Sequence, residues 1–251
     1  MKTMRTGLTP FMKPLDVHVW TFTFDPMYPE CTAWERLLAG DEIVRSKKYK
    51  FSRDRLRFIA RRGILRQLLG RYCGLDPAEI NYRINPYGKL SLRSNSLSFS
   101  LSHSEDRVAL AFTLEKTVGV DIEQLLPLPE LFRLIDHWFS SAEQAGLLAL
   151  APEVQLEAFY HVWTQKEAYL KARGEGLTAS LKDFSVSVDP DKPGRLLSVR
   201  KPSPDTIQWK IACHVPEAGW RMAVCVHSQA EIHTNWYAPD LADFLSWDTS
   251  G

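Results

Sequence analysis

The chain has 251 residues, of which 45% are hydrophobic and 24% are charged, and its formal net charge is +1. This composition is that of an ordinary soluble globular protein with one large or two modest domains, and the charge argues neither for nor against a polyanionic partner. No apolar run approaches the ~20 residues of a membrane-spanning helix, no signal peptide is recognised, and the four scattered cysteines lack metal-site or disulfide spacing, so we expect a cytoplasmic protein.

The first half of the chain predicts a strand, a group of helices and two further strands. Residues 17–24 alternate between apolar and polar side chains, which indicates a strand, whereas residues 1–14 are expected to form a loose arm. Residues 52–72 predict a long helix in which Ala60 and Gly63 would let another element approach closely. The other elements expected here are helices at 34–38 and 43–49, a turn at 85–89, and strands at 97–103 and 107–114.

The second half predicts three helices and four strands. Ser140 and Glu143 have the spacing of a capping box, which marks the start of a helix that runs to about residue 150. The next helix is expected to end just before Gly174 and Gly176, because glycine readily adopts the left-handed conformation that follows a helix. The tail at 228–251 is less regular and is expected to be peripheral. The other elements expected are a helix at 131–139 and strands at 117–123, 184–188, 209–214 and 221–227.

The two halves contain similar strands. Residues 107–112 read Arg-Val-Ala-Leu-Ala-Phe, and residues 221–226 read Arg-Met-Ala-Val-Cys-Val. In each half a long helix precedes the strand. This weak internal repeat indicates two similar α/β halves joined near residues 115–120.

Charged side chains occupy unexpected positions on the helix that ends before Gly174. Lys166 falls within its apolar stripe, Glu167 lies at the edge of the stripe, and Lys171 follows Glu167 by one turn. A buried charge needs a partner because unpaired burial is costly, and that partner would be another protein group, or a ligand and a metal. A simple Glu–Lys surface pair is the alternative. The apolar stripe consists of Phe159, Val162, Trp163 and Leu170.

Two carboxylates share one face of the strand predicted at 117–123. Because side chains alternate between the faces of a strand, Asp121 and Glu123 point the same way, about 6–7 Å apart, and Gly119 leaves room on that face. With a third carboxylate from another element they would form a hard oxygen site of the kind that suits Mg²⁺. The alternative is a sheet edge with solvated acids.

Cations and an aromatic turn add groups that suit a phosphate or nucleotide. Residues 45–71 contain eleven lysines and arginines against one acid, Asp54, which indicates a nucleic-acid backbone, a phosphate-rich small molecule or an acidic protein as partner. The turn at 85–89 would bring together an aromatic ring, exposed backbone and a lysine. His103 takes an apolar position in the serine-rich strand 98–104, either as an ordinary edge residue or, with its flanking serines, as a contact for anionic oxygens.

In their order along the chain, these segments resemble the 4′-phosphopantetheinyl transferases of the larger, monomeric type that activates surfactin synthetase. The most specific signal is Gly-x-Asp-x-Glu at 119–123 followed by Trp-x-x-Lys-Glu-x-x-x-Lys at 163–171. One departure is that Leu90 follows the turn where the family usually has proline. The resemblance covers roughly residues 40–227 and includes the segments 85–89, 100–104, 139–143 and 221–225.

The resemblance implies a mixed α/β (α+β) fold with two pseudo-symmetric halves. Each half would be a small, mostly antiparallel sheet packed on a long helix, with the active site in the cleft between the halves. We expect the halves at 15–117 and 118–228, and a peripheral tail at 229–251. The implied reaction moves the 4′-phosphopantetheine arm of coenzyme A to a serine of an apo acyl or peptidyl carrier protein and releases adenosine 3′,5′-bisphosphate. The implied enzyme is a Mg²⁺-dependent monomer without nucleic-acid or membrane partners.

The resemblance also implies roles for individual residues. Asp121, Glu123 and Glu167 would hold Mg²⁺ against the pyrophosphate of coenzyme A, and Lys171 would neutralise charge on that pyrophosphate. Glu167 is the first candidate for the base that accepts the serine proton, and a metal-bound water is the second. Lys166 matches the motif without a defined role. The implied contacts of coenzyme A are Tyr87 and Gly88 at the adenine, and Ser102, His103, Arg45, Arg57 and Lys89 at the 3′-phosphate.

Two alternatives stay open at this point. A nucleic-acid-binding module would use the basic helix at 45–71 and predicts salt-dependent retention on DNA or RNA, but it gives the acidic motifs no role. A carrier-binding protein without catalysis would need damaged ligand positions, and all three carboxylates are present.

Overall fold

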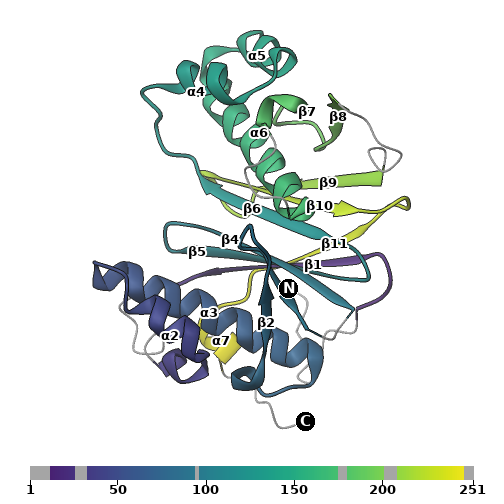
Figure 1. Ribbon diagram of the computed structural model, residues 1–251. Helices are drawn as coiled ribbons and strands as arrows, with labels where there is room; N and C mark the ends of the chain where they lie inside the picture. Colours follow the sequence, from purple (N-terminus) through teal and green to yellow (C-terminus); the bar gives the residue numbers. More distant parts are fainter. Residues whose placement is uncertain (1–11, 26–32, 94–95, 175–179, 201–207, 246–251) are drawn as a thin grey trace.

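The computed structural model describes residues 12–25, 33–93, 96–174, 180–200 and 208–245, and these form four layers (Figure 1). A long helix, α3 (Ser52–Cys73), covers the outer face of one sheet, and a second long helix, α6 (Pro152–Arg173), covers the outer face of the other. The two sheets face each other between the helices. This mixed α+β architecture with two halves confirms the fold class that the sequence predicts.

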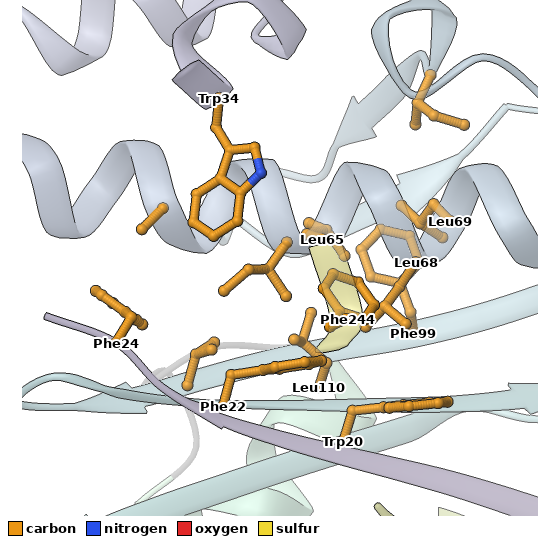
Figure 2. Packing of buried hydrophobic residues seen from close by; sticks show 14 of the residues in the cluster. Trp20, Phe22, Phe24, Trp34, Leu65, Leu68, Leu69, Phe99, Leu110 and Phe244 are labelled. Atoms are coloured by element: carbon orange, nitrogen blue, oxygen red, sulfur yellow. The ribbon is translucent and has the colours of Figure 1, made fainter. Parts of the chain in front are cut away.

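The sheet beside α3 is antiparallel except at one edge. Its strands lie in the order β11-β1-β5-β4, and β11 runs parallel to β1. β1 directs Trp20 and Phe22 toward α3, where they join Leu65 in a buried cluster (Figure 2). Val17 and Val19 point to the opposite face of the sheet. The strand bounds are Asp16–Thr23 for β1, Leu97–Ser104 for β4, Arg107–Leu114 for β5 and His233–Tyr237 for β11.

The sheet beside α6 is fully antiparallel, in the order β6-β10-β9. Phe159, Val162 and Leu170 of α6 pack on its outer face in a second buried cluster. Ser140 and Glu143 form the capping box that the sequence predicts at the start of α5 (Ser141–Leu148). The other bounds are Val118–Gln124 for β6, Leu131–Trp138 for α4, Trp209–His214 for β9 and Trp220–His227 for β10.

A third buried cluster fills the space between the two sheets. It joins side chains of β1 and β5 to side chains of β6 and β10. Because both faces of these strands are covered, their sequences are largely apolar. β4 and β6 also lie next to each other, and at this place the polar residues of the two sheets meet.

Several short elements complete the structure. β2, β3 and β8 were not expected from the sequence, because three or four residues cannot establish an alternating pattern. A Cβ atom on Gly63 would lie 2.4 Å from Trp34 Cγ, which confirms the close approach expected there. Gly176 lies outside the described residues. The short elements are α2 (Gly40–Ser46), β2 (Tyr82–Ile84), β3 (Leu90–Leu92), β7 (Phe184–Val186), β8 (Leu196–Val199), α7 (Leu241–Leu245) and 3-10 helices at Trp34–Leu37, Pro77–Glu79 and Leu181–Asp183.

The expectation of a peripheral tail at 229–251 is wrong for the part that the structure describes. β11 extends the first sheet beside β1, and Phe244 of α7 is only 1% exposed, with its ring centroid 4.7 Å from that of Phe22. Arg71 of α3 donates a hydrogen bond to Phe244 O at 2.9 Å. The tail therefore completes the first half of the molecule. Within the described residues, no helix combines the length and apolar character of a membrane span.

Candidate active site

Serine side chains connect the two sheets where β4 lies beside β6. Ser100 Oγ accepts a hydrogen bond from Val120 N at 3.2 Å, and Ser104 Oγ accepts one from Gln124 N at 3.3 Å. Between them, the hydroxyl of Ser102 reaches a carboxylate of β6. The serines that alternate along β4 therefore bond across the junction between the sheets. A contact of the serines beside His103 with anionic oxygens, one of the two interpretations of the sequence, stays a prediction.

Asp121 is the buried centre of this junction and is 3% exposed. Its Oδ1 accepts hydrogen bonds from Ser102 Oγ at 2.7 Å and from Lys171 Nζ at 2.6 Å, and Lys171 Nζ also donates to Ser102 Oγ at 2.7 Å. Ser102 Oγ is thus bonded to Asp121 and Lys171, and its expected contact with the 3′-phosphate stays a prediction. Among the described residues, Asp121 Oδ2 is buried without a hydrogen-bond partner. Such an atom is costly unless a ligand satisfies it.

Asp121 lies close enough to Glu123 and Glu167 for its charge to raise the pKa of both. Burial raises the pKa of Glu123 to about 7; the charges of Asp121 and Glu167 also raise it, and Ser104 and Lys171 oppose the rise. Burial, and then the charge of Asp121, also raises the pKa of Glu167. A divalent cation would relieve this repulsion, so the donor set fits Mg²⁺. Within the described ranges, however, no three His, Cys, Asp or Glu side chains already form a metal-binding cluster.

A close contact between α6 and β6 holds Glu167 and Lys171 at the junction. A Cβ atom on Gly119 would lie 2.0 Å from the carbonyl oxygen of Ala168. Glycine at this position therefore lets the helix backbone lie directly on the strand. The sequence indicated that Gly119 leaves room for something to approach, and the element that approaches is α6.

His103 lies at the end of β4, surrounded by cations. Although part of the ring is exposed, desolvation by the surrounding atoms, together with the smaller effects of the charges of Arg61, Lys171, Arg57 and Arg62, lowers the pKa of His103 to about 3. The imidazole is therefore neutral near pH 7, in a positive environment that an anion would stabilise. This is the environment expected of a phosphate site.

The two arginines predicted to contact the 3′-phosphate have different surroundings. Arg57 donates from Nε to Asp106 Oδ1 at 2.6 Å and from a terminal nitrogen to Glu105 Oε2 at 2.8 Å, so its charge is already neutralised. Arg45 is exposed and lies 5.6 Å from the ring centroid of Phe58. Arg57 lies close enough to His103 for its charge to lower the pKa of that histidine, and both arginines stay predicted contacts of the 3′-phosphate.

Arg62 is a site residue that the sequence reasoning missed. It lines the same cavity as Tyr87 and Lys171, and its guanidinium lies 5.4 Å from the ring centroid of Phe58. Its Nε is 3.5 Å from Glu42 Oε1, and burial lowers the pKa of Arg62. The run contains eleven cations, and no spacing rule separates Arg62 from the other ten. It is identified only by its position in the fold, where it lines the cavity together with residues of β4.

The basic run is not a continuous positive surface. Arg61 and Arg66 are only 8% and 0% exposed, and Arg53 and Arg55 each pair with an acidic side chain. A helix that tracked a nucleic-acid backbone would instead present its cations to solvent. The nucleic-acid alternative therefore has no support in this arrangement.

The turn at 85–89 has the conformation that its sequence predicts. Gly88 has a φ of 86°, in the left-handed region that favours glycine. Asn85 Oδ1 accepts hydrogen bonds from the backbone nitrogens of Tyr87 and Lys89, both at 2.9 Å. The ring of Tyr87 stays 54% exposed, which suits the contact with adenine that the motif implies.

Lys89 lines the cavity, but its ammonium group is bonded to backbone carbonyls. Its Nζ donates to the carbonyl oxygens of Lys171 at 2.7 Å, Ala172 at 2.9 Å and Val118 at 3.2 Å. Because an ammonium group has three hydrogens, these three bonds leave none for a 3′-phosphate. Burial also lowers the pKa of Lys89 to about 8.

A cavity of about 460 Å³ lies between the turn, β4 and α6. A larger hollow of about 750 Å³ lies beside Thr23 and Arg107, but Arg107 there is paired with Glu217 and none of the sequence motifs reaches it. We assign the site to the smaller cavity because cations, a carboxylate and the turn converge on it. Its lining residues are Arg62, Tyr87, Gly88, Lys89, Leu90, Phe99, Ser100, Leu101, Glu167, Leu170, Lys171 and Gly174.

Lys166, whose role the sequence left open, forms a buried ion pair with Glu143. It is fully buried, and its Nζ is 2.8 Å from Glu143 Oε2. The ammonium also donates to Leu181 O at 2.7 Å and to Phe184 O at 2.6 Å. Burial lowers the pKa of Lys166, and the charge of Glu143 opposes this change. Lys166 therefore ties α6 to the start of α5 and to β7.

Comparison with known proteins agrees with the motifs. A family model described as the 4′-phosphopantetheinyl transferase superfamily matches residues 117–225. The chain is 34% identical to the 4′-phosphopantetheinyl transferase HetI of Nostoc sp. over 185 residues, which cover 72% of this chain and 78% of that protein. It is 29% identical to the 4′-phosphopantetheinyl transferase Sfp of Bacillus subtilis over 189 residues, with coverage of 75% and 81%. A phosphopantetheinyl transferase of Thraustochytrium sp. is 32% identical over 195 residues, with coverage of 70% and 67%.

Proposed function

The chain belongs to the 4′-phosphopantetheinyl transferase superfamily, and from this membership we propose how the residues of its cleft perform the reaction. The enzyme transfers the 4′-phosphopantetheine arm of coenzyme A to a serine of a carrier protein. The observation that supports our assignment of the site is the hydrogen-bonded group of Asp121, Ser102 and Lys171 beside the 460 Å³ cavity. Action as a monomer stays a prediction from the family resemblance.

Asp121, Glu123 and Glu167 are the proposed ligands of Mg²⁺. The unpartnered Oδ2 of Asp121 and the raised pKa values of Glu123 and Glu167 support this donor set. When bound, the ion would stabilise the negative charge on the pyrophosphate oxygens of coenzyme A. Glu167 also lines the cavity, so this carboxylate would lie beside the substrate.

The proposed reaction is an in-line phosphoryl transfer. The serine oxygen of the carrier forms a bond to the β-phosphorus of coenzyme A, and the bond from that phosphorus to the bridging oxygen breaks. Adenosine 3′,5′-bisphosphate leaves with the electron pair. Lys171 would stabilise charge on the bridging and leaving oxygens, and Glu167 would accept the serine proton, for which its raised pKa is favourable.

The nucleotide part of coenzyme A would occupy the cavity between α3 and the turn. Tyr87 and Gly88 are the proposed neighbours of the adenine. His103, Arg45 and Arg62 are the proposed contacts of the 3′-phosphate, because arginine forks and a histidine in a positive environment suit a dianion. Arg57 stays a predicted contact of the 3′-phosphate, although acidic side chains already engage it, and Lys89 is left out because backbone carbonyls engage its ammonium group.

Incubation with coenzyme A, Mg²⁺ and an apo carrier protein tests the proposal. Intact-mass spectrometry should detect a gain of ~340 Da on the carrier, the mass of the covalently attached arm. Omission of Mg²⁺, and separately a carrier whose acceptor serine is replaced by alanine, should each abolish the gain. A mass gain that persists without any divalent cation would contradict the metal assignment, and no gain on any apo carrier would contradict the function.

A further inference from the structure

The carbonyl end of α6 needs partners from outside the helix. The last four carbonyl groups of a helix accept no hydrogen bond from the helix itself. α6 ends at Arg173. The next residue, Gly174, has a φ of 69°, and Gly174 N donates to Leu170 O at 3.0 Å. This bond satisfies the carbonyl of Leu170. The carbonyls of Lys171 and Ala172 in the last turn, and that of Gly174 beyond it, need donors from other elements.

Two side chains of the 85–89 turn supply these donors. Lys89 Nζ bonds to Lys171 O at 2.7 Å and to Ala172 O at 2.9 Å. Asn85 Nδ2 bonds to Gly174 O at 2.7 Å. A cation at this end also complements the negative end of the helix dipole. A turn of the first half of the molecule thus caps a helix of the second half.

The same lysine connects α6 to β6. Its third hydrogen bond goes to Val118 O at 3.2 Å, at the first residue of β6 and three positions before Asp121. A Cβ atom on Gly174 would lie 3.0 Å from Lys89 Cδ, so the stem of the lysine is packed against the helix end as well. One ammonium group therefore joins the element that carries Lys171 to the element that carries Asp121.

We infer that Asn85 and Lys89 are positioning residues that fix the last turn of α6 against β6, and that they act on the transfer through Lys171. This inference rests on the proposed function, because it concerns the placement of Lys171 beside the pyrophosphate. Lys171 is both a residue whose carbonyl is capped and the residue whose side chain bonds to Asp121. Without the cap, the last helical turn frays, and the ammonium of Lys171 loses its fixed position.

Lys89→Met tests the inference, because it keeps the stem and removes the donors. We expect a fall in kcat of about 10- to 100-fold, the range that a misplacement of about 1 Å produces. The ratio of KM for 3′-dephospho-coenzyme A to KM for coenzyme A should stay unchanged, since Lys89 does not touch the 3′-phosphate. His103→Gln, the comparison variant, should reduce that ratio. A reduced ratio in Lys89→Met would make Lys89 a phosphate ligand and overturn the inference.

Asn85→Asp is the second variant, and it is less disruptive. It keeps the acceptor oxygens that bond to Tyr87 N and Lys89 N, but it removes the donor to Gly174 O. Hydrogen exchange of the substrate-free protein should be faster at the amides of residues 170–174 in this variant and in Lys89→Met. Lys89→Arg, which retains charged donors, should restore part of the protection and of kcat. Unchanged exchange in both variants would overturn the inference.

The outcomes separate this inference from the proposed function. If the unchanged enzyme fails to modify any apo carrier, the proposed function fails, while the exchange experiment still decides whether the turn caps α6. If transfer occurs but the variants alter neither kcat nor exchange, the function stands and the positioning role is wrong.

Discussion

Lys171 Nζ donates a hydrogen bond to Asp121 Oδ1 at 2.6 Å, and the two residues differ strongly in burial, because 32% of the side chain of Lys171 is exposed but Asp121 is buried. The ammonium therefore presents its open side to the cleft while it neutralises a carboxylate behind it. A phosphate that enters the cleft would meet a cation that is already fixed, which lowers the reorganisation needed during the reaction.

Asp121→Asn should reduce transfer by about 100-fold or more, because it removes a charge at the reacting centre. The amide keeps the shape of the side chain, so the thermal unfolding temperature should change little. Rates of carrier modification at several Mg²⁺ concentrations measure the effect. Asp191→Asn, at an exposed position, is the control and should keep the normal rate. A Mg²⁺-dependent rate close to normal in Asp121→Asn would contradict its role as a ligand.

Gly119→Ala should destabilise the fold by about 1–3 kcal/mol or more, the cost of overpacking a buried contact. The new methyl group would lie 2.0 Å from Ala168 O, a backbone atom that cannot move alone. Urea unfolding followed by fluorescence measures the change. Gly40→Ala is the control, because no atom lies within 4 Å of its Cβ position. Equal stability of the two variants would show that α6 does not lie on Gly119.

The protonation of His103 should change when coenzyme A binds. Its pKa in the folded protein is lowered from 6.5 to about 3, so the ring opposes folding increasingly as pH falls below 6.5. A phosphate dianion would supply a counter-charge and raise this pKa, so binding at pH 6 should take up a proton. Calorimetry in buffers of different ionisation enthalpy measures the uptake. His103→Gln should abolish it, and equal uptake in both proteins would exclude His103 as the group involved.

Lys166→Met should cost about 3–5 kcal/mol of stability, because it leaves Glu143 buried without its cation. The double variant Lys166→Met with Glu143→Gln should recover part of this loss. Denaturant unfolding of the four proteins gives the coupling energy. The exposed pair Arg133–Glu130 is the control and should contribute less than about 1 kcal/mol. A coupling energy as small as that of the control would show that the buried pair does not form.

Arg62→Gln should raise KM for coenzyme A by about 10- to 100-fold, the loss of one charge-assisted hydrogen bond. KM for 3′-dephospho-coenzyme A should change much less. Arg57→Gln should have a smaller effect on both, because Glu105 and Asp106 already neutralise Arg57. Steady-state kinetics with the two donors compares the variants. A larger effect of Arg57→Gln would reverse our choice between these arginines.

The elements and the family could be predicted from the sequence because their signals are local. The alternation in β1, the glycine after α6 and the Ser140–Glu143 capping box each depend on a few neighbouring residues. Asp121 and Glu123 share a face of one strand for the same reason. The family resemblance, which pairs the motif at 119–123 with the motif at 163–171, then predicted that Glu167 joins these two acids in one site.

The surroundings of individual side chains could not be predicted, because they depend on contacts between distant segments. Lys89 and Ser102 belong to recognisable motifs, yet their partners lie on α6 and β6. Arg57 and Arg62 look alike in a basic run, and only the position of the loop at 105–106 separates a neutralised arginine from one that lines the cavity. The tail was misjudged because β11 has no strong alternation, and its place is set by the free edge of β1.

The pairing of β11 with β1 also determines how the molecule can be divided. The chain builds most of the first half, passes through all of the second half, and then returns with β11 and α7 to finish the first. The second half is thus an insertion within a discontinuous first half. A truncation after residue 228 would remove the strand beside β1 and expose Phe22. The first half therefore cannot be produced as one contiguous segment. The second half is contiguous, because it begins with β6 and ends with β10.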